Sequence, residues 1–217
     1  MTEALRPVMT VIAGPNGSGK TTLAKKLLGH GWTRGAAYIN ADEIARDRFG
    51  DWNSPQAVVQ AAEYADELRT TFLENGENFA YETVFSTQKR IDDLTRAQNA
   101  GFFIRFFFVA TADPSINIAR VIRRVQSGGH DVPKEKIVER YHRSVANLLR
   151  ALRIADRAYV IDNSADDCDP QMLYRTVSGR IRRRYGDELP NWSNAAFSVL
   201  PRDDAAPGAL SPGSGPS

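Results

Sequence analysis

The chain has 217 residues, with 42% hydrophobic and 25% charged residues and a formal net charge of +2. This length and composition suit one globular domain with a substantial core, and the charge favours neither presence nor absence of a nucleic-acid partner. The single cysteine, Cys168, excludes an internal disulfide and suits a reducing compartment. No apolar run approaches the roughly 20 residues that span a bilayer, and the N-terminus lacks the apolar stretch of a signal peptide. We therefore expect a cytoplasmic protein with no membrane contact.

The first half of the chain alternates strands and helices. An apolar strand at residues 9–13 precedes a helix at 21–28 that stops at Gly29. A short strand at 37–40 leads into a charged helix that starts near Asp42. Pro55 begins a longer helix that ends at Asn75-Gly76, and a further strand follows at 79–84.

The second half continues the alternation. A helix at 87–99 is followed by an almost wholly apolar strand at 102–110, as expected of a strand covered on both faces. Helices are predicted at 115–126 and 134–156, a last strand at 158–161 and a last helix at about 170–185. This alternation predicts a three-layer α/β fold around a mainly parallel sheet, in one domain over residues 1–189. Residues 190–217 are rich in Pro, Gly, Ser and Ala and are predicted to form a disordered tail, most clearly over the last fifteen or so.

A phosphate-binding motif, G-x-x-x-x-G-K-[ST], occupies residues 14–21 between the first strand and the first helix. Its glycines allow successive backbone N–H groups to point at phosphate oxygens, and the helix N-terminus adds positive charge. Lys20 is expected to bridge the β- and γ-phosphates and the Thr21 hydroxyl to ligate Mg²⁺. The sequence thus predicts binding of Mg²⁺ with ATP or GTP by Gly14, Asn16, Gly17, Ser18, Gly19, Lys20, Thr21 and Thr22.

Two carboxylates fall at the carboxyl ends of predicted strands, where open α/β sheets bind ligands. Asp42 suits a base or anchor for an acceptor hydroxyl and Glu82 suits a ligand of Mg²⁺, although the two roles are interchangeable at this stage. Asp42 would alternatively cap the next helix. Thr83 and Ser86 are candidate hydrogen-bond donors to substrate, or caps of the following helix. Together these residues predict a kinase site.

Arginines gather on the two helices that flank a glycine-containing loop at residues 127–133. Between residues 118 and 157 ten lysine and arginine residues face four acidic residues. Because phosphoryl transfer spreads negative charge over three oxygens, closing arginines stabilise it. We therefore expect a helical lid whose phosphate contacts come from Arg120, Arg123, Arg124 and Arg140. A solvated basic face is the plainer alternative, and binding of a nucleic-acid backbone is disfavoured because Tyr141 is the only aromatic residue in this stretch.

With these residues placed, the chain resembles the zeta-toxin family of P-loop kinases. The resemblance rests on an ordered set of motifs over roughly residues 8–165: A-G-P-N-G-S-G-K-T-T at 13–22, N-A-D at 40–42, E-T at 82–83, S-G-G-H-D-V-P at 127–133 and D-N-S at 162–164. One position departs from the pattern, since family members tend to carry a second arginine in the loop that here contains Gly128, Gly129 and His130. Either Arg140 substitutes from the next helix, or the second arginine is absent.

The resemblance implies a bacterial kinase with an adenylate-kinase-like fold that phosphorylates a hydroxyl of UDP-N-acetylglucosamine or a similar amino-sugar nucleotide. It also implies a toxin held inactive by a small antitoxin protein. By this analogy Asp42 is the catalytic base, Glu82 and Thr83 contact the substrate and metal-bound water, and Arg120 or Arg123 is the lid arginine. The residues themselves also admit a kinase of another small molecule, a polynucleotide 5′-hydroxyl kinase and a regulatory nucleoside triphosphatase.

Overall fold

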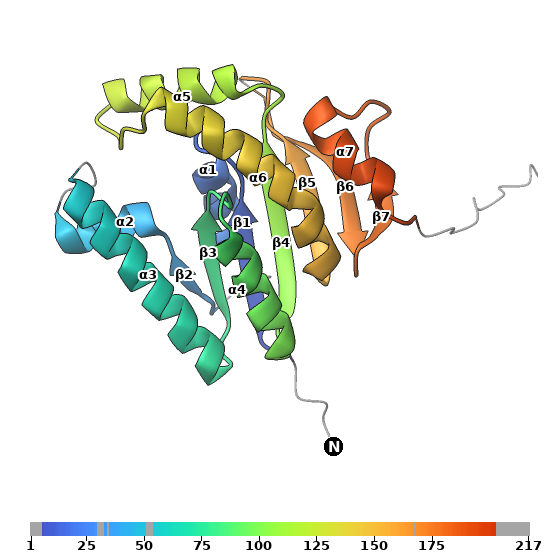
Figure 1. Cartoon of the computed structure of the whole chain (residues 1–217), viewed down its shortest axis with the longest axis horizontal. Coiled ribbons are helices and arrows are strands. Elements are labelled where there is room, and N and C mark those ends of the chain that lie inside the picture. The colour runs from blue at the N-terminus through green and yellow to red at the C-terminus, as the bar shows by residue number, and fades with distance from the viewer. Residues whose placement is uncertain (1–5, 30–32, 34, 51–53, 167, 203–217) are drawn as a thin grey trace, which may run out of the picture.

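The computed structural model describes residues 6–29, 33, 35–50, 54–166 and 168–202. Within them one sheet of seven strands has the order β2-β3-β1-β4-β5-β6-β7 (Figure 1). The strands are β1 (Val8–Ala13), β2 (Ala37–Ile39), β3 (Phe79–Thr83), β4 (Phe103–Ala110), β5 (Arg157–Asp162), β6 (Gln171–Val177) and β7 (Arg180–Arg184).

The five strands from β2 to β5 across the sheet are parallel, as the sequence predicts. Their register is close to level at the carboxyl ends, where Ala13 of β1 pairs with Thr83 of β3 on one side and Phe108 of β4 on the other. Loops that leave these strands therefore meet at one edge of the sheet, which is where ligands bind in such folds.

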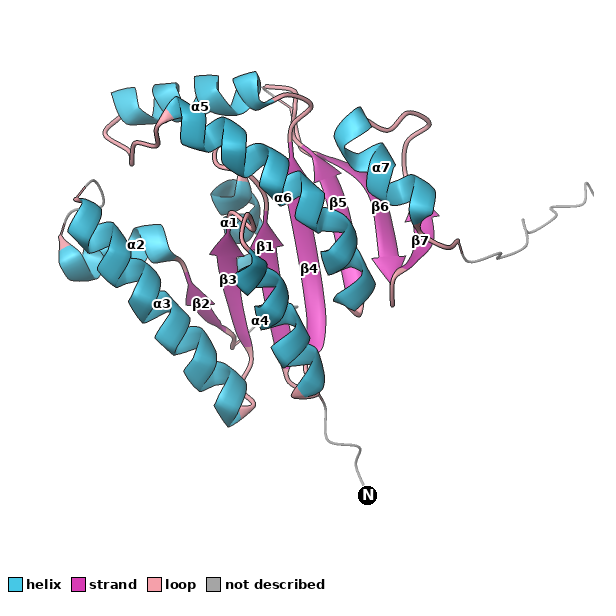
Figure 2. Cartoon of the chain, viewed as in Figure 1, coloured by secondary structure: helices cyan, strands magenta, loops and turns pink. Residues whose placement is uncertain are grey.

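Helices cover both faces of the sheet (Figure 2). They are α1 (Lys20–Leu28), α2 (Ala41–Phe49), α3 (Pro55–Asn75), α4 (Gln88–Asn99), α5 (Pro114–Gln126), α6 (Lys134–Ile154) and α7 (Asn191–Val199). Helices α3, α4, α6 and α7 share the main core with one sheet face, and α1 packs Leu23 and Leu27 on the other against Phe107 and Tyr159. The predicted three-layer arrangement is confirmed.

Large aromatic side chains dominate the main core. Phe106 and Phe108 of β4 are fully buried, with ring centroids 6.3 Å apart, and Phe106 also meets Phe85 edge to face at 5.1 Å. Burial of one such side chain contributes about 1.5–3 kcal/mol. This fixes β4 under α6, and α5 in turn packs on α6 through a separate small cluster of Val121, Val132 and Ile137.

The predicted helix at 170–185 is wrong, because this segment forms the antiparallel hairpin β6–β7. Its turn has positive φ at both central residues, 47° at Ser178 and 74° at Gly179, which is the geometry of a tight hairpin turn. The hairpin extends the sheet beyond β5, with Leu173 and Tyr174 facing the core. The arginine-rich sequence of β7 suggests a helix. The segment forms a strand instead, because the apolar side chains of the hairpin are buried against the core.

The predicted domain boundary at residue 189 is also wrong. Helix α7 packs on the core through Trp192, Ala196 and Phe197, which are all buried, and the Trp192 ring lies 5.8 Å from that of Phe108. These three apolar residues recur at helical spacing and stabilise a packed helix, although the segment as a whole is rich in small and polar residues. The domain therefore continues to at least residue 202, and residues 203–217 of the predicted tail lie outside the described residues.

Among the described residues, no helix combines the length and apolar character needed to cross a bilayer.

Candidate active site

The phosphate-binding motif forms a loop between β1 and α1 whose backbone needs glycine. Gly17 has a φ of 74° and Gly19 a φ of 95°. A Cβ at Gly19 would lie 2.3 Å from the amide nitrogen of Asn163, and one at Gly17 would lie 2.6 Å from the carbonyl oxygen of Asn117. Helix α1 then begins at Lys20 without a side-chain cap, so its first N–H groups are left for an anionic ligand.

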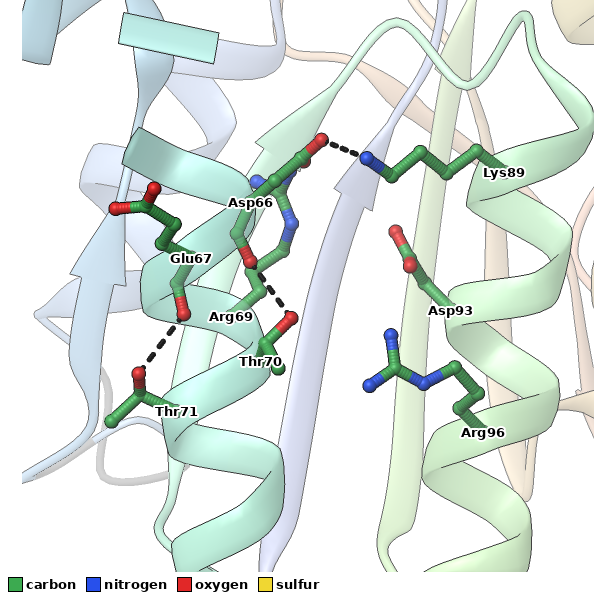
Figure 3. A pocket seen from close by; sticks show the side chains of 8 residues that line it. All are labelled: Asp66, Glu67, Arg69, Thr70, Thr71, Lys89, Asp93 and Arg96. Atoms are coloured by element: carbon green, nitrogen blue, oxygen red, sulfur yellow. Dashed lines mark hydrogen bonds and ion pairs between the residues drawn. The ribbon is translucent and has the colours of Figure 1, made fainter. Parts of the chain in front are cut away.

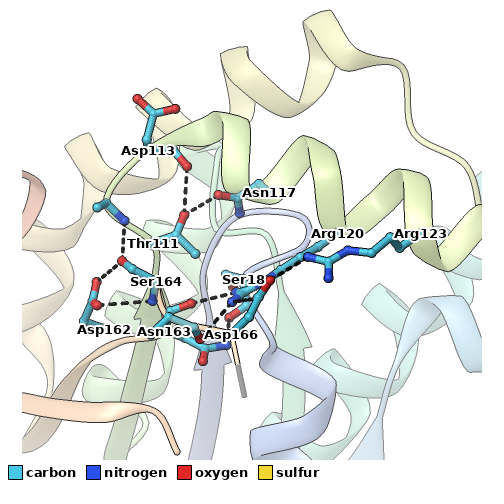
Figure 4. Close-up of polar contacts among 12 residues, drawn as sticks. Ser18, Thr111, Asp113, Asn117, Arg120, Arg123, Asp162, Asn163, Ser164 and Asp166 are labelled. Carbon is cyan, nitrogen blue, oxygen red and sulfur yellow. Dashed lines mark hydrogen bonds and ion pairs between the residues drawn. The ribbon is translucent and has the colours of Figure 1, made fainter. Parts of the chain in front are cut away.

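Two asparagines from other elements hold the carbonyl groups of this loop (Figure 4). The fully buried Asn117 of α5 donates from Nδ2 to the carbonyl of Asn16 at 2.6 Å and accepts from the Thr111 hydroxyl. Asn163, after β5, donates from Nδ2 to the carbonyl of Ser18 at 2.8 Å. Because C=O and N–H of a peptide unit point in opposite directions, fixing the carbonyls outward turns the loop N–H groups toward the phosphate side.

Glu82 lies at the end of β3, next to the first turn of α1. Its Oε2 accepts from the Thr21 hydroxyl at 3.0 Å, and its Oε1 accepts from the Tyr38 hydroxyl and from Nδ2 of Asn40 at 3.3 Å. Burial raises the pKa of the Glu82 carboxyl, while the hydrogen bond from Tyr38 and the charge of Lys20 oppose that rise. Thr21 and Glu82, each predicted to be a ligand of Mg²⁺, are therefore in direct contact.

Asp42 is the second residue of α2 and lines the same cavity as Glu82. The alternative that Asp42 caps the helix is wrong, because Asn40 is the N-cap and its Oδ1 accepts from the backbone N–H of Asp42 at 3.0 Å. The carboxylate of Asp42 is exposed, and its charge raises the pKa of both Lys20 and Glu82. Because the carboxylate of Asp42 does not cap α2, it is available to contact a ligand in the cavity.

Lys20 lies half-buried between these carboxylates and the arginines of the opposite helices. Its Nζ donates to the carbonyl of Pro15 at 2.7 Å. Burial lowers its pKa to about 8, against the opposing effects of Glu82 and Asp42 and with a further lowering by Arg124 and Arg140. The ligand-free site therefore carries a lysine that loses its charge not far above neutral pH.

We expect the affinity of the free protein for ATP to fall as the pH rises through about 8, by up to about tenfold per pH unit. Below that pH Lys20 is protonated and attracts the triphosphate, whereas above it a proton must be taken up on binding. Titration calorimetry between pH 7 and pH 9.5 measures this. Lys20→Arg is the control, because a guanidinium stays charged throughout and should show a flat profile. A flat profile in the native protein would contradict the account.

Arg124 and Arg140 line the cavity from α5 and α6. Arg124 also donates to the carbonyl of His130 at 2.6 Å, which ties the glycine-containing loop to α5. Both arginines act on the charge of Lys20. Arg140 reaches the cavity from α6 and not from the glycine-containing loop.

Arg120 and Arg123 are placed differently from the prediction. Both bind Asp166, at 2.7 Å and 2.9 Å, and Arg120 also donates to the carbonyl of Asn163 at 2.7 Å (Figure 4). Arg120 still lines the cavity, but Arg123 is not among its lining residues. The expected role of Arg123 at the phosphates is therefore wrong. Its side chain binds Asp166, an acidic residue in the loop after β5 that is distant in the sequence.

The cavity has a volume of about 760 Å³ and extends well beyond the phosphate-binding loop. Thr22, Thr83 and Ser86 also line it. The Thr83 hydroxyl accepts from the backbone N–H of Phe85 at 3.1 Å, and Phe85 has a φ of 60° that is unusual for a buried aromatic residue. Such strain at a strand end, held by core packing, is typical of ligand-binding turns.

The residues at the phosphate end fit a magnesium ion. The described residues contain no group of three or more His, Cys, Asp or Glu that would hold a metal. Magnesium does not require such a group, because it is commonly bound by one or two protein oxygens together with phosphates and water. The Thr21 hydroxyl and Glu82 carboxylate, in contact at the start of α1, are an oxygen pair of that kind.

Comparison with known proteins agrees with this geometry. The family model for zeta toxin matches residues 1–174. The chain belongs to the zeta toxin family. With an intact phosphate-binding loop in a P-loop kinase fold, this zeta toxin family member is an ATP-dependent kinase. An uncharacterized protein of Haemophilus influenzae is 28% identical over 130 residues, which cover 59% of this chain and 88% of that protein.

Solved structures share the fold at lower identity. A chain of the PezAT chromosomal toxin–antitoxin system of Streptococcus pneumoniae matches with a TM-score of 0.59 and 19% identity, over 79% of this chain and 72% of that one. A chain of the AvrRxo1-ORF1:-ORF2 complex with ATP matches with a TM-score of 0.63 and 15% identity, over 91% and 64%. A chain of the Pnkp1/Rnl/Hen1 RNA repair complex matches with a TM-score of 0.53 and 18% identity, over 68% and 47%.

Sequence reasoning missed several residues of the site. Asn117 and Thr111 look like ordinary polar residues, and only their burial at 0% exposure marks them. Tyr38 and Asn40, which donate to Glu82, did carry a signal, since both lie at the end of a predicted strand beside Asp42.

Proposed function

We propose that the chain transfers the γ-phosphoryl group of ATP to a hydroxyl of a UDP-amino sugar such as UDP-N-acetylglucosamine, and that it acts as a cytoplasmic toxin. The observation that carries this proposal is the shared cavity. Lys20, Asp42 and Glu82 line one end together with Arg124 and Arg140, and the rest of the cavity leaves room for an acceptor.

In the proposed reaction the acceptor oxygen attacks the γ-phosphorus while the bond to the β-bridging oxygen breaks. Asp42 takes the proton of the acceptor hydroxyl, which suits an exposed carboxylate that no helix cap occupies. ADP and a phosphate monoester are the products. Lys20 and the arginines Arg124 and Arg140 stabilise the charge that spreads over the transferred group.

Thr21 and Glu82 would hold Mg²⁺, which neutralises charge on the β- and γ-phosphate oxygens when bound. Glu82 suits this role better than that of the base. Three donors already fix its carboxylate next to the Thr21 hydroxyl, whereas Asp42 has none of these contacts. Thr83 and Ser86 are left to contact the acceptor from the strand end.

A toxin of this kind needs restraint, and we propose an antitoxin protein as partner. The supporting observation is that zeta toxin family membership joins a fold shared with a chain of the PezAT toxin–antitoxin system. Such a partner would cover the cavity, whose lining includes residues of α3 and α6, and so block the access of ATP and acceptor.

The acceptor is tested by incubating the protein and Mg-ATP with UDP-N-acetylglucosamine, free N-acetylglucosamine or a 5′-hydroxyl oligonucleotide, followed by mass spectrometry. We expect one added phosphoryl group on the UDP-sugar and ADP in equal amount. An unchanged UDP-sugar, with the oligonucleotide or free sugar phosphorylated instead, would overturn the assignment. Expression in bacteria should arrest growth, and Asp42→Asn should relieve that arrest.

A further inference from the structure

A cluster of charged side chains joins α3 to α4 below the cavity of the candidate active site. Asp66 of α3 binds three cations, Arg69 of the same helix and Lys89 and Arg90 of α4, the last at 2.7 Å. Arg90 binds Asp93 as well, at 2.6 Å. Figure 3 shows Asp66 and Lys89 reaching toward one another across the groove between the two helices.

The two arginines of this cluster both line the cavity of the candidate active site. Arg69 lines both the 760 Å³ cavity and a neighbouring groove of about 390 Å³, and Arg90 lines the larger cavity beside Ser86 and Thr87. The Arg69 side chain is only 9% exposed and lies over the Tyr81 ring at 5.0 Å. A cation is costly to bury without strong compensation, so its position at a cavity floor calls for an explanation.

Charge within the cluster is not balanced. Three cations share the carboxylates of Asp66 and Asp93, which leaves one positive charge in excess. Burial lowers the pKa of Arg69 to about 10, and the positive charge of the neighbouring Arg90 contributes to this lowering. An anionic group of a ligand bound at the cavity floor would neutralise this excess positive charge.

Helix α3 gives the cavity a wall that leads from the reacting end to this cluster. Val58, Ala62, Ala65 and Arg69 recur at helical spacing and all line the cavity. At 1.5 Å per residue the wall from Val58 to Arg69 is roughly 16 Å long. The small side chains of Ala62 and Ala65 leave space for a ligand along this wall, and the guanidinium of Arg69 lies at its far end.

We propose that Arg69 and Arg90 form a subsite for an anionic group of the acceptor, such as a phosphate or diphosphate, held away from the hydroxyl that is phosphorylated. The inference rests on the proposed function, because it assigns the acceptor to this cavity. It selects elongated, negatively charged acceptors over neutral sugars, since a pair of largely buried guanidinium groups discriminates by charge-assisted hydrogen bonds. Arginine suits such groups because its planar fork pairs with two oxygens.

A solely structural ion network is the competing explanation, and Arg90→Gln separates the two. Arg96→Gln is the matched control, since it also removes a guanidinium from α4 and lines the small groove but not the larger cavity. The phosphate-binding loop is first saturated with Mg²⁺ and a non-hydrolysable ATP analogue. Binding of inorganic pyrophosphate, UDP-N-acetylglucosamine and N-acetylglucosamine is then measured by calorimetry, with thermal unfolding as the check on folding.

We expect Arg90→Gln to weaken binding of pyrophosphate and of the UDP-sugar by roughly tenfold, while Arg96→Gln stays within about threefold. Affinity for the ATP analogue should not change. Equal pyrophosphate affinity in folded Arg90→Gln and native protein would overturn the subsite. The native protein alone supplies a second test that no misfolded variant can obscure: failure of pyrophosphate to bind below about 10 mM would also overturn it.

The result is separable from the proposed function. If pyrophosphate binding depends on Arg90 but the UDP-sugar is not phosphorylated, the subsite holds and the choice of acceptor is wrong. If the UDP-sugar is phosphorylated with the same KM by native protein and Arg90→Gln, the acceptor holds and the subsite is wrong.

Discussion

Replacing Lys20 with alanine is expected to lower kcat by about two to three orders of magnitude, the usual effect of removing one preorganised donor from a transferred group. Lys20 is the first residue of α1, and its half-buried side chain lies among Glu82, Asp42 and the arginines of the opposite helices. The variant should remain folded, because burial already disfavours the lysine charge in the ligand-free protein. Single-turnover measurement of ADP formation at saturating ATP reads the effect.

Lys25→Ala is the matched control for this experiment. Lys25 lies on the same helix but is exposed and is not among the residues that line the cavity. Its loss should leave kcat within about twofold, as is usual for a surface substitution. Native-like turnover by Lys20→Ala would mean that the phosphate-binding loop does not carry the reaction.

Asp42→Asn is expected to reduce kcat by about 10²–10⁴-fold with nearly unchanged affinity for ATP, because the amide cannot accept the proton of the acceptor hydroxyl. The substitution preserves the shape of the side chain. It also spares the helix start, since Asn40 and not Asp42 caps α2. Pre-steady-state kinetics of phosphoryl transfer, with separate titration of ATP, divides the effect between chemistry and binding.

Glu43→Gln provides the neighbouring control, since Glu43 is also in the first turn of α2 but is not among the cavity-lining residues. Its kcat should be close to native. If Asp42→Asn lost ATP affinity and kcat in equal measure, Asp42 would belong to the metal or nucleotide site and the proton acceptor would have to be sought elsewhere.

Much of this site is readable from the sequence because its residues follow strand ends in order. The motif at 14–21 fixes a strand, a turn and a helix at once, and parallel strands bring Asp42 and Glu82 to the same edge. What the sequence does not show is the set of partners that hold these groups. Asn117 and Asn163 reach the phosphate-binding loop from more than a hundred residues away in the chain.

The arginines illustrate the same limit. All four predicted arginines lie on the predicted helices, but their side chains divide between two environments. Asp166 binds Arg120 and Arg123, whereas Arg124 and Arg140 turn toward Lys20. Helical spacing gives the face on which a side chain lies but not the acidic residue of another loop that captures it.

The errors in the C-terminal part have a different origin. Residues 180–184 read R-I-R-R-R, which composition assigns to a helix because arginine is a good helix former. The Ser178-Gly179 turn was the available signal for a hairpin. In α7, Trp192 and Phe197 decide the packing against a background of small and polar residues.

The central claim is that this cavity passes a phosphoryl group to a hydroxyl and not to water. The most direct measurement is the ratio of ADP to phosphate ester to free phosphate when the protein turns over Mg-ATP with UDP-N-acetylglucosamine. The account predicts ADP and sugar-nucleotide phosphate ester in equal amounts, with little free phosphate and with turnover that stops when the acceptor is omitted. ADP matched by free phosphate, at a rate that the acceptor does not change, would contradict it.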